Sequence, residues 1–368
     1  MGGSRRFTPV RAALHRDPGK DVGSVYQGVF HMRRLAPAVG LFLLAPLVAE
    51  YLLGNLPITF LVGLPALAPM YGGGALLVRE VARRGGRGWP TILLLALAYG
   101  VLEEGIATQS LFNPNYVGQH LLSYGYISAL GIAGPWTVFV LTLHTVWSIS
   151  VPIALVEAVT PSRRTTPWLG RVGLAVTAGL FAVGVVVTVA ISLAQDSFLA
   201  SVPQFAVTVV VILALVVGAL RLRPGLATGP ARAKRGTAPH PFVVGVVTMV
   251  AGAAFFLGKN AGETVPAALM VVAYLLLYAV AVLVVRRWST LAGWGEDHRV
   301  ALAGGALLTY AWHAFPEGSL GRGNDAVDLI GNAVFAAAAA ALVIVAFRRA
   351  RSGSGTPSPV PVGEGRSL

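Results

Sequence analysis

"VGLAVTAGLFAVGVVVTVAISLA", residues 172–194, is a run of small and apolar residues without a single charged side chain. A helix needs about 20 apolar residues to cross the hydrocarbon core of a bilayer. This run is long enough to do so, and it is too apolar for a helix on the surface of a soluble domain. It therefore predicts a transmembrane helix.

Nine further runs of the chain have a similar character. The composition agrees, because 55% of the residues are hydrophobic and only 12% are charged, whereas soluble domains carry about 25% charged residues. The sequence thus predicts an all-α, polytopic integral membrane helix bundle with about ten transmembrane helices. The ten predicted segments are 36–54, 57–78, 90–111, 130–158, 172–194, 203–220, 241–258, 264–285, 300–316 and 327–347.

The basic residues predict the orientation of these helices. If both termini lie in the cytoplasm, only Lys259 and Arg322 of the 28 Lys and Arg fall in outer loops. Such an asymmetry is typical of membrane proteins, in which basic residues stay on the cytoplasmic side. It favours an N-in, C-in topology, and it accounts for the net charge of +13 without a nucleic-acid partner. We expect the chain to lie in the lipid bilayer as a multi-pass protein of the cell membrane, namely a bacterial plasma membrane.

The same pattern divides the chain into parts. Residues 221–240 form a basic loop, predicted to be a cytoplasmic linker between six helices in 36–220 and four helices in 241–347. Residues 1–35 are predicted to be a basic cytoplasmic tail. Residues 348–368 are rich in Ser, Gly and Pro and are predicted to be a disordered cytoplasmic tail.

The candidate functional residues interrupt this apolar background. In "AYGVLEEGIATQS", residues 98–110, Glu103 and Glu104 stand side by side within a predicted span. A charged residue at membrane depth costs about 2.5–3.5 kcal/mol on the insertion scale and usually faces the protein interior. Glu50, His144 and His313 also fall in the central-to-outer half of their predicted spans. We expect these five side chains to meet in one cavity.

Further polar residues surround them. A polar segment, 111–128, follows the glutamates and is predicted to cover them as a lid. Glu157, near the inner end of its span, is instead predicted to form a surface ion pair near Arg163 and Arg164. Four more side chains complete the predicted cluster: Thr108 and Ser148, which lie four residues after Glu104 and His144, and Gln109 and Asn113.

Carboxylates combined with imidazole suit a divalent metal such as zinc, with a spare glutamate as general base. The chain has no cysteine, which excludes thiolate ligands and cysteine nucleophiles. It also has no H-E-x-x-H motif, P-loop, dinucleotide fingerprint or G-x-S-x-G elbow. The candidate site is therefore indicated by a set of residues distributed over several helices and not by a sequence motif.

"LEEGIAT", residues 102–108, followed by one histidine on the next span and another further on, resembles the CPBP family of intramembrane metalloproteases, which includes CAAX and bacteriocin-processing proteases. That family carries E-E-x-x-x-R, F-x-x-x-H and H-x-x-x-N or D. Glu103 and Glu104 match the paired glutamates, and His144 and His313 match the two histidines, with Glu317 four residues after His313. The resemblance implies metal-dependent cleavage of a membrane peptide. Glu103 or Glu104 would activate water, and His144 would hold the metal with His313 or the other glutamate.

The chain also departs from the family pattern. Thr108 stands where the family has arginine, and Val140 stands at the phenylalanine position, with Phe139 one residue earlier. Two other classes remain open. The carboxylates could bind a proton or a cation in a coupled transporter, or the polar cluster could only fix helix packing in a non-catalytic scaffold.

Overall fold

The computed structural model describes residues 34–224, 236–316 and 325–352. Contacts divide the chain into Met1–Ala36 and Pro37–Leu368, and, apart from the first three residues of the first helix, the features below belong to the second unit. Glu317, Arg322, most of both predicted tails and residues 225–235 of the predicted linker lie outside the described residues.

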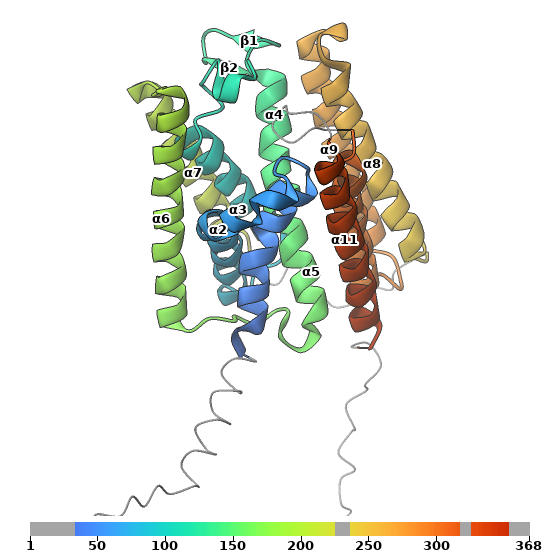
Figure 1. Ribbon diagram of the computed structural model, residues 1–368. Coiled ribbons are helices and arrows are strands. Elements are labelled where there is room, and N and C mark those ends of the chain that lie inside the picture. Colours follow the sequence, from blue (N-terminus) through green and yellow to red (C-terminus); the bar gives the residue numbers. More distant parts are fainter. Residues whose placement is uncertain (1–33, 225–235, 317–324, 353–368) are drawn as a thin grey trace, which may run out of the picture. The chain divides into compact units, whose positions relative to one another are not determined.

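The described part is predominantly helical, which confirms the predicted fold class (Figure 1). Its strands form one short antiparallel hairpin of β1 (Tyr126–Ile127) and β2 (Ile132–Ala133). The first helix covers Arg34–Leu52 and ends in the π-helical turn η1 (Leu47–Leu52). The other helices and helical turns are η2 Ile58–Gly63, α2 Leu64–Arg84, α3 Trp89–Leu102, η3 Glu103–Ala107, η4 Tyr116–Gly118, α4 Gly134–Thr142, η5 Leu143–Ser150, α5 Val151–Val159, η6 Pro161–Arg163, α6 Arg171–Asp196, α7 Val202–Arg221, α8 Pro241–Ala261, η7 Gly262–Thr264, α9 Ala267–Ser289, α10 Glu296–His313 and α11 Ala326–Ser352.

Each of the ten predicted segments is helical, and nine helices in the described residues are long and apolar enough to cross a membrane. The predicted 300–316 span, α10, is the exception, because its first turn carries Glu296, Asp297 and Arg299. Of its 18 residues, 12 are buried, and it packs against α8, α11 and α5. A helix that is surrounded by protein does not need a lipid-compatible surface.

The most apolar spans are the least buried. Only 11% of the most apolar window of α6 is buried inside the protein, against 67% for the Trp89–Ala107 and Gly134–Val159 spans. In α6 the buried residues are small or polar, Thr177, Gly184 and Ser192, and most of its large side chains face outward. This is the arrangement of a membrane protein, in which lipid takes the outer apolar surface and polar groups turn inward.

Small residues let the inner helices approach closely. A methyl group on Gly72 of α2 would lie 2.0 Å from the Phe42 carbonyl oxygen of the first helix, and one on Gly184 would lie 2.5 Å from the Met70 nitrogen. On the other side of the bundle, aromatic rings fill the space. Trp147 of η5 stacks on Tyr310 of α10, with 4.8 Å between ring centroids.

A buried ion network closes one end of the bundle. α2 continues to Arg84, through residues predicted to form a loop, because its charges are paired inside the protein. Arg79 and Glu80 are fully buried and contact each other at 3.0 Å. Arg83 donates two hydrogen bonds to Glu157, at 2.8 and 2.6 Å, and Arg79 lies 3.0 Å from the same carboxylate.

We call Arg79, Glu80, Arg83 and Glu157 the arginine–glutamate network. The predicted surface ion pair of Glu157 was wrong, because this side chain is buried among arginines of α2. Arg79 also stacks on the Trp168 ring, 3.2 Å from its centroid. Its Nη2 donates to the carbonyl oxygens of Arg163, Arg164 and Thr166.

Candidate functional site

Four ionisable residues of the predicted cluster lie on π-helical turns. Glu103 and Glu104 begin η3, His144 lies in η5, and Glu50 lies in η1. In η3 the Thr108 amide donates to the Glu103 carbonyl five residues earlier, at 2.8 Å. π-Helical turns are rare and occur frequently at functional sites. Neighbouring residues of an α-helix do not face each other. The π-helical turn is wider, and it lets the adjacent carboxylates of Glu103 and Glu104 reach the same imidazole.

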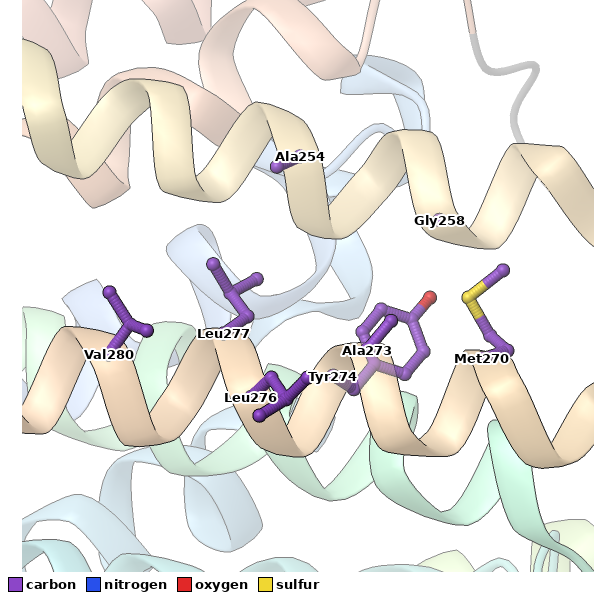
Figure 2. A pocket seen from close by; sticks show the side chains of 8 residues that line it. All are labelled: Ala254, Gly258, Met270, Ala273, Tyr274, Leu276, Leu277 and Val280. Carbon is purple, nitrogen blue, oxygen red and sulfur yellow. The ribbon is translucent and has the colours of Figure 1, made fainter.

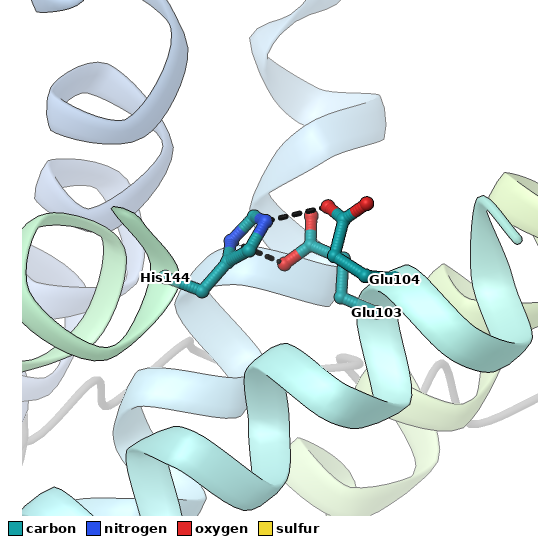
Figure 3. A group of neighbouring side chains, drawn as sticks. All are labelled: Glu103, Glu104 and His144. Atoms are coloured by element: carbon teal, nitrogen blue, oxygen red, sulfur yellow. Dashed lines mark hydrogen bonds and ion pairs between the residues drawn. The ribbon is translucent and has the colours of Figure 1, made fainter. Parts of the chain in front are cut away.

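The imidazole of His144 lies between the two carboxylates (Figure 3). Its Nδ1 is 2.8 Å from Glu103 Oε2, and its Nε2 is 2.6 Å from Glu104 Oε1. One donor atom from each residue lies within 4.8 Å of the other two. Glu103, Glu104 and His144 are exposed by only 1%, 5% and 7%. We call these three residues the carboxylate–histidine cluster.

Hydroxyl groups hold Glu104 in place. Thr108 donates to Glu104 Oε2 at 3.1 Å, and Ser110 donates to the same oxygen. Ser110 in turn accepts a hydrogen bond from Trp136 Nε1 at 3.3 Å. The predicted pairing of Ser148 with His144 is also present, at 3.2 Å between Oγ and Nδ1.

Glu50 adjoins the cluster through tyrosines. Tyr71 Oη donates to Glu50 Oε1, and Asn55 Nδ2 donates to Oε2 at 3.2 Å. The Tyr71 ring stacks beside His144, with 6.3 Å between centroids, and the Tyr99 ring lies 6.1 Å from His144. The structure therefore places Glu50 next to the cluster but outside the group of metal-ligand spacing.

Gln109 and Asn113 do not enter the cluster. Gln109 Oε1 accepts a hydrogen bond from the Ala200 amide at 2.7 Å, and Asn113 Nδ2 donates to Asp196 Oδ2 at 3.0 Å. Both side chains fasten the residues after η3 to the connection between α6 and α7.

His313 points into a different part of the core. Its ring centroid is 3.7 Å from that of Phe256, and Trp312 packs against it as well. Among the described residues, the group with metal-ligand spacing consists of Glu103, Glu104 and His144 alone. The structure thus brings three of the predicted metal and catalytic residues together and leaves His313 in an aromatic environment.

An apolar hollow of about 350 Å³ lies elsewhere, between α8 and α9 (Figure 2). It is lined by residues such as Gly258, Met270, Tyr274 and Leu277. The Tyr274 hydroxyl is bonded to the Phe255 carbonyl, so the hollow presents little polar chemistry. It shares no lining residue with the carboxylate–histidine cluster.

Sequence reasoning missed several parts of the site. Tyr71 lies on α2, far from the glutamates in sequence, and nothing in its own segment indicates its contact with Glu50. The π-helical turns also leave no recognisable sequence signal. For Asp196 the signal was available, since it is an acidic residue directly at the end of an apolar span.

A family model described as an uncharacterized membrane protein family matches residues 40–352, most of the chain. No curated protein and no solved structure matches the chain.

Proposed function

The chain belongs to this uncharacterized membrane protein family, and we propose that it is a membrane-embedded, metal-dependent hydrolase that cleaves a membrane peptide. Glu104 and His144 would bind one divalent ion, such as zinc, and Glu103 would act beside it. The observation that carries the proposal is a buried group of two carboxylates and one imidazole with donor atoms within 4.8 Å of one another.

The donor set fits a catalytic metal centre. Catalytic zinc sites take His, Glu and Asp as ligands and leave a position for water or substrate, and Glu104 and His144 are ligands of these types. Both nitrogens of His144 are engaged by carboxylates, so ion binding would replace one of these contacts. An oxygen-rich set also admits Mn²⁺ or Fe²⁺.

The charges of the cluster support a bound cation. Two buried carboxylates face a single imidazole, so a protonated ring can balance only one of them when both are ionised. Glu50 adds a further carboxylate next to this group. Buried charges are ordinarily paired or coordinate a metal, and a divalent ion would supply the missing positive charge.

The hydrogen bonds suggest separate roles for the two glutamates. Metal ligands are usually oriented by outer hydrogen bonds, and Glu104 is oriented by Thr108 and Ser110. We therefore assign Glu104 and His144 to hold the ion and Glu103 to accept the proton of the attacking water. When bound, the ion would polarise the scissile carbonyl and make water more acidic. The resemblance to the CPBP metalloproteases at "LEEGIAT" suggests a peptide as the substrate.

Metal analysis of the purified protein tests the proposal. We expect about one equivalent of metal in the wild type and little in His144→Ala or Glu104→Gln. His313→Gln is the matched control, because it changes a buried histidine outside the cluster and should keep the metal. Equal, negligible metal in all four proteins would refute the site. If His313→Gln also lost the metal, His313 would be a ligand, as the family resemblance implies.

Cleavage is tested separately. Single-span peptides are reconstituted with the protein in liposomes, and their fragments are identified by mass spectrometry. Glu103→Gln should retain the ion and lose cleavage, since this variant keeps both assigned ligands. A protein that binds metal but leaves every such peptide intact would argue against the peptidase assignment.

A proton- or cation-coupled transporter is the second candidate. It is favoured by the position of the His144 ring, which has one nitrogen within 2.8 Å of each carboxylate and can accept a proton and pass it on. Liposomes loaded with a pH-sensitive dye distinguish the two functions. A transporter gives a proton flux that Glu104→Gln abolishes, whereas a hydrolase gives none. In a purely structural cluster, Glu104→Gln would change only stability.

A further inference from the structure

The carboxylate–histidine cluster is closed to solvent, and its cover differs from one side to another. Between the helices the packing is tight. A methyl group on Gly105 would lie 2.6 Å from Thr208 Cγ2 of α7, and one on Gly74 would lie 2.3 Å from the Tyr99 ring. Beyond Ala107 the cover changes, because the chain there leaves the helical path and crosses the end of the cluster.

Residues 112–125 form this part of the chain, and Asp196 fastens the segment near its beginning. The carboxylate of Asp196, at the end of α6, accepts hydrogen bonds from Asn113 Nδ2 and from the Val117 amide, both at 3.0 Å. Near the other end, Tyr124 Oη donates to the Val265 carbonyl. One side chain thus fastens both the beginning and the middle of the segment.

The chain that enters this segment is bonded to Glu104, because the Leu111 amide donates to the Glu104 carbonyl at 3.2 Å and Ser110 donates to the carboxylate. Burial raises the pKa of Tyr116, and the negative charges of Glu104, Glu50 and Glu103 raise it further. Tyr116 is therefore close enough to interact electrostatically with the carboxylates, although it belongs to a turn outside the membrane-spanning helices.

The backbone of this region is strained. In the described part of the chain, four residues other than glycine have a positive backbone φ angle, namely Gln109, Val117, His120 and Ser197. All four lie in this segment, just before it or beside Asp196. Val117 has a φ of 45°, which is costly for a β-branched residue. Such strain persists only where surrounding contacts impose it, and it occurs often in clamps and switch regions.

We infer that residues 112–125 form a lid with Asp196 as its latch, and that ions and the polar part of a substrate reach Glu104 by displacing this lid. The inference rests on the proposed function, because a buried metal site that acts on a peptide needs an entrance for the ion and the substrate. Release of the Val117 amide by Asp196 also removes the constraint that holds Val117 at positive φ. Opening at the Asp196 end would then require the loss of these two hydrogen bonds, with the Tyr124–Val265 bond as the anchor at the far end of the segment.

The lack of native cysteine permits a direct test that needs no metal and no substrate. Ser110→Cys places a single thiol beneath the lid, at a position with no solvent exposure. A membrane-impermeant thiol reagent is applied to this variant alone and combined with Asp196→Ala. We expect Asp196→Ala to increase the labelling rate about tenfold or more, because a charged acceptor of two hydrogen bonds is removed. Asp196→Glu, which keeps the carboxylate, should restore part of the slow labelling.

Two controls define the outcome. Asp297→Ala removes a carboxylate at the start of α10 and should leave the labelling of Ser110→Cys unchanged. Ala301→Cys, buried in α10, should stay slow in the Asp196→Ala background. Unchanged labelling at Ser110→Cys would overturn the inference, and so would faster labelling at both thiols, since Asp196 would then stabilise the whole fold. Absence of bound metal would refute the proposed function and leave this result untouched.

Discussion

The molecule contains two buried groups of charged side chains, and they are built in opposite ways. The arginine–glutamate network pairs two arginines with two glutamates, and Arg79 adds three backbone carbonyls. The carboxylate–histidine cluster has two carboxylates for one imidazole, with Glu50 beside it. The first group is complete without any partner. The second is complete only with a cation or additional protons.

The difference teaches how to separate structural from functional charge in this chain. The network lies on regular turns of α2 and α5 and connects them to the chain after α5. The cluster lies on π-helical turns. Burial alone does not distinguish the two groups, because both are almost fully inaccessible. Charge balance and backbone geometry do.

The largest effect is expected when the network loses one partner. Arg79→Met removes the guanidinium and leaves Glu80 and Glu157 short of a positive charge inside the protein. Breaking a buried ion pair in this way costs about 3–5 kcal/mol. Thermal unfolding in detergent should show a large fall in the midpoint. A double variant, Arg83→Met with Glu157→Leu, should cost less than the sum of its single changes, and additivity would contradict direct pairing.

A smaller effect is expected at the hydroxyl groups of the cluster. Thr108→Val keeps the shape of the side chain and removes one hydrogen bond to Glu104. Loss of such an orienting contact lowers metal affinity about 10–100-fold. Titration with Zn²⁺ or Mn²⁺ measures this change, and Thr177→Val of α6 serves as a control that should have no effect. An unchanged affinity in Thr108→Val would mean that Glu104 is not a ligand.

The smallest effect has the opposite sign. In metal-free protein, Glu103→Gln removes one of the unbalanced negative charges, and we expect it to stabilise the fold by about 0.5–2 kcal/mol, as often happens when functional residues are replaced. The unfolding midpoint with chelator present tests this. If Glu103→Gln instead destabilised the fold, Glu103 would have a structural role like the residues of the arginine–glutamate network, and the contrast between the network and the cluster would not hold.

Much of the architecture could be predicted from the sequence. Long apolar runs need lipid around them, so the ten helices follow from composition and length. Their boundaries shift where tertiary contacts intervene, as at Arg79 and Arg83, which extend α2 because Glu157 neutralises them. Orientation in the membrane stays a prediction from the basic residues.

The candidate site could be predicted only in part. Ionisable residues at membrane depth identified Glu103, Glu104 and His144, since their cost demands a shared interior position. The same argument could not assign the neighbours of His313. It requires only an interior position, and a position next to Phe256 is also interior. Helical spacing placed Thr108 and Ser148 correctly, but the contacts of Gln109, Asn113 and Tyr71 depend on how distant helices pack.

The π-helical turn at Glu103–Ala107 makes the site sensitive to chain length as well as to composition. A helix in which one residue of this turn is deleted can regain ordinary i to i−4 hydrogen bonding. Every position on one side of the deletion is then rotated by about 100° around the axis relative to the other. The paired carboxylates would no longer face the same histidine, although each side chain of the site could remain in the sequence. A homologue can therefore keep Glu-Glu and His and still lack the site, and an alignment gap in this turn would be as informative as a substitution.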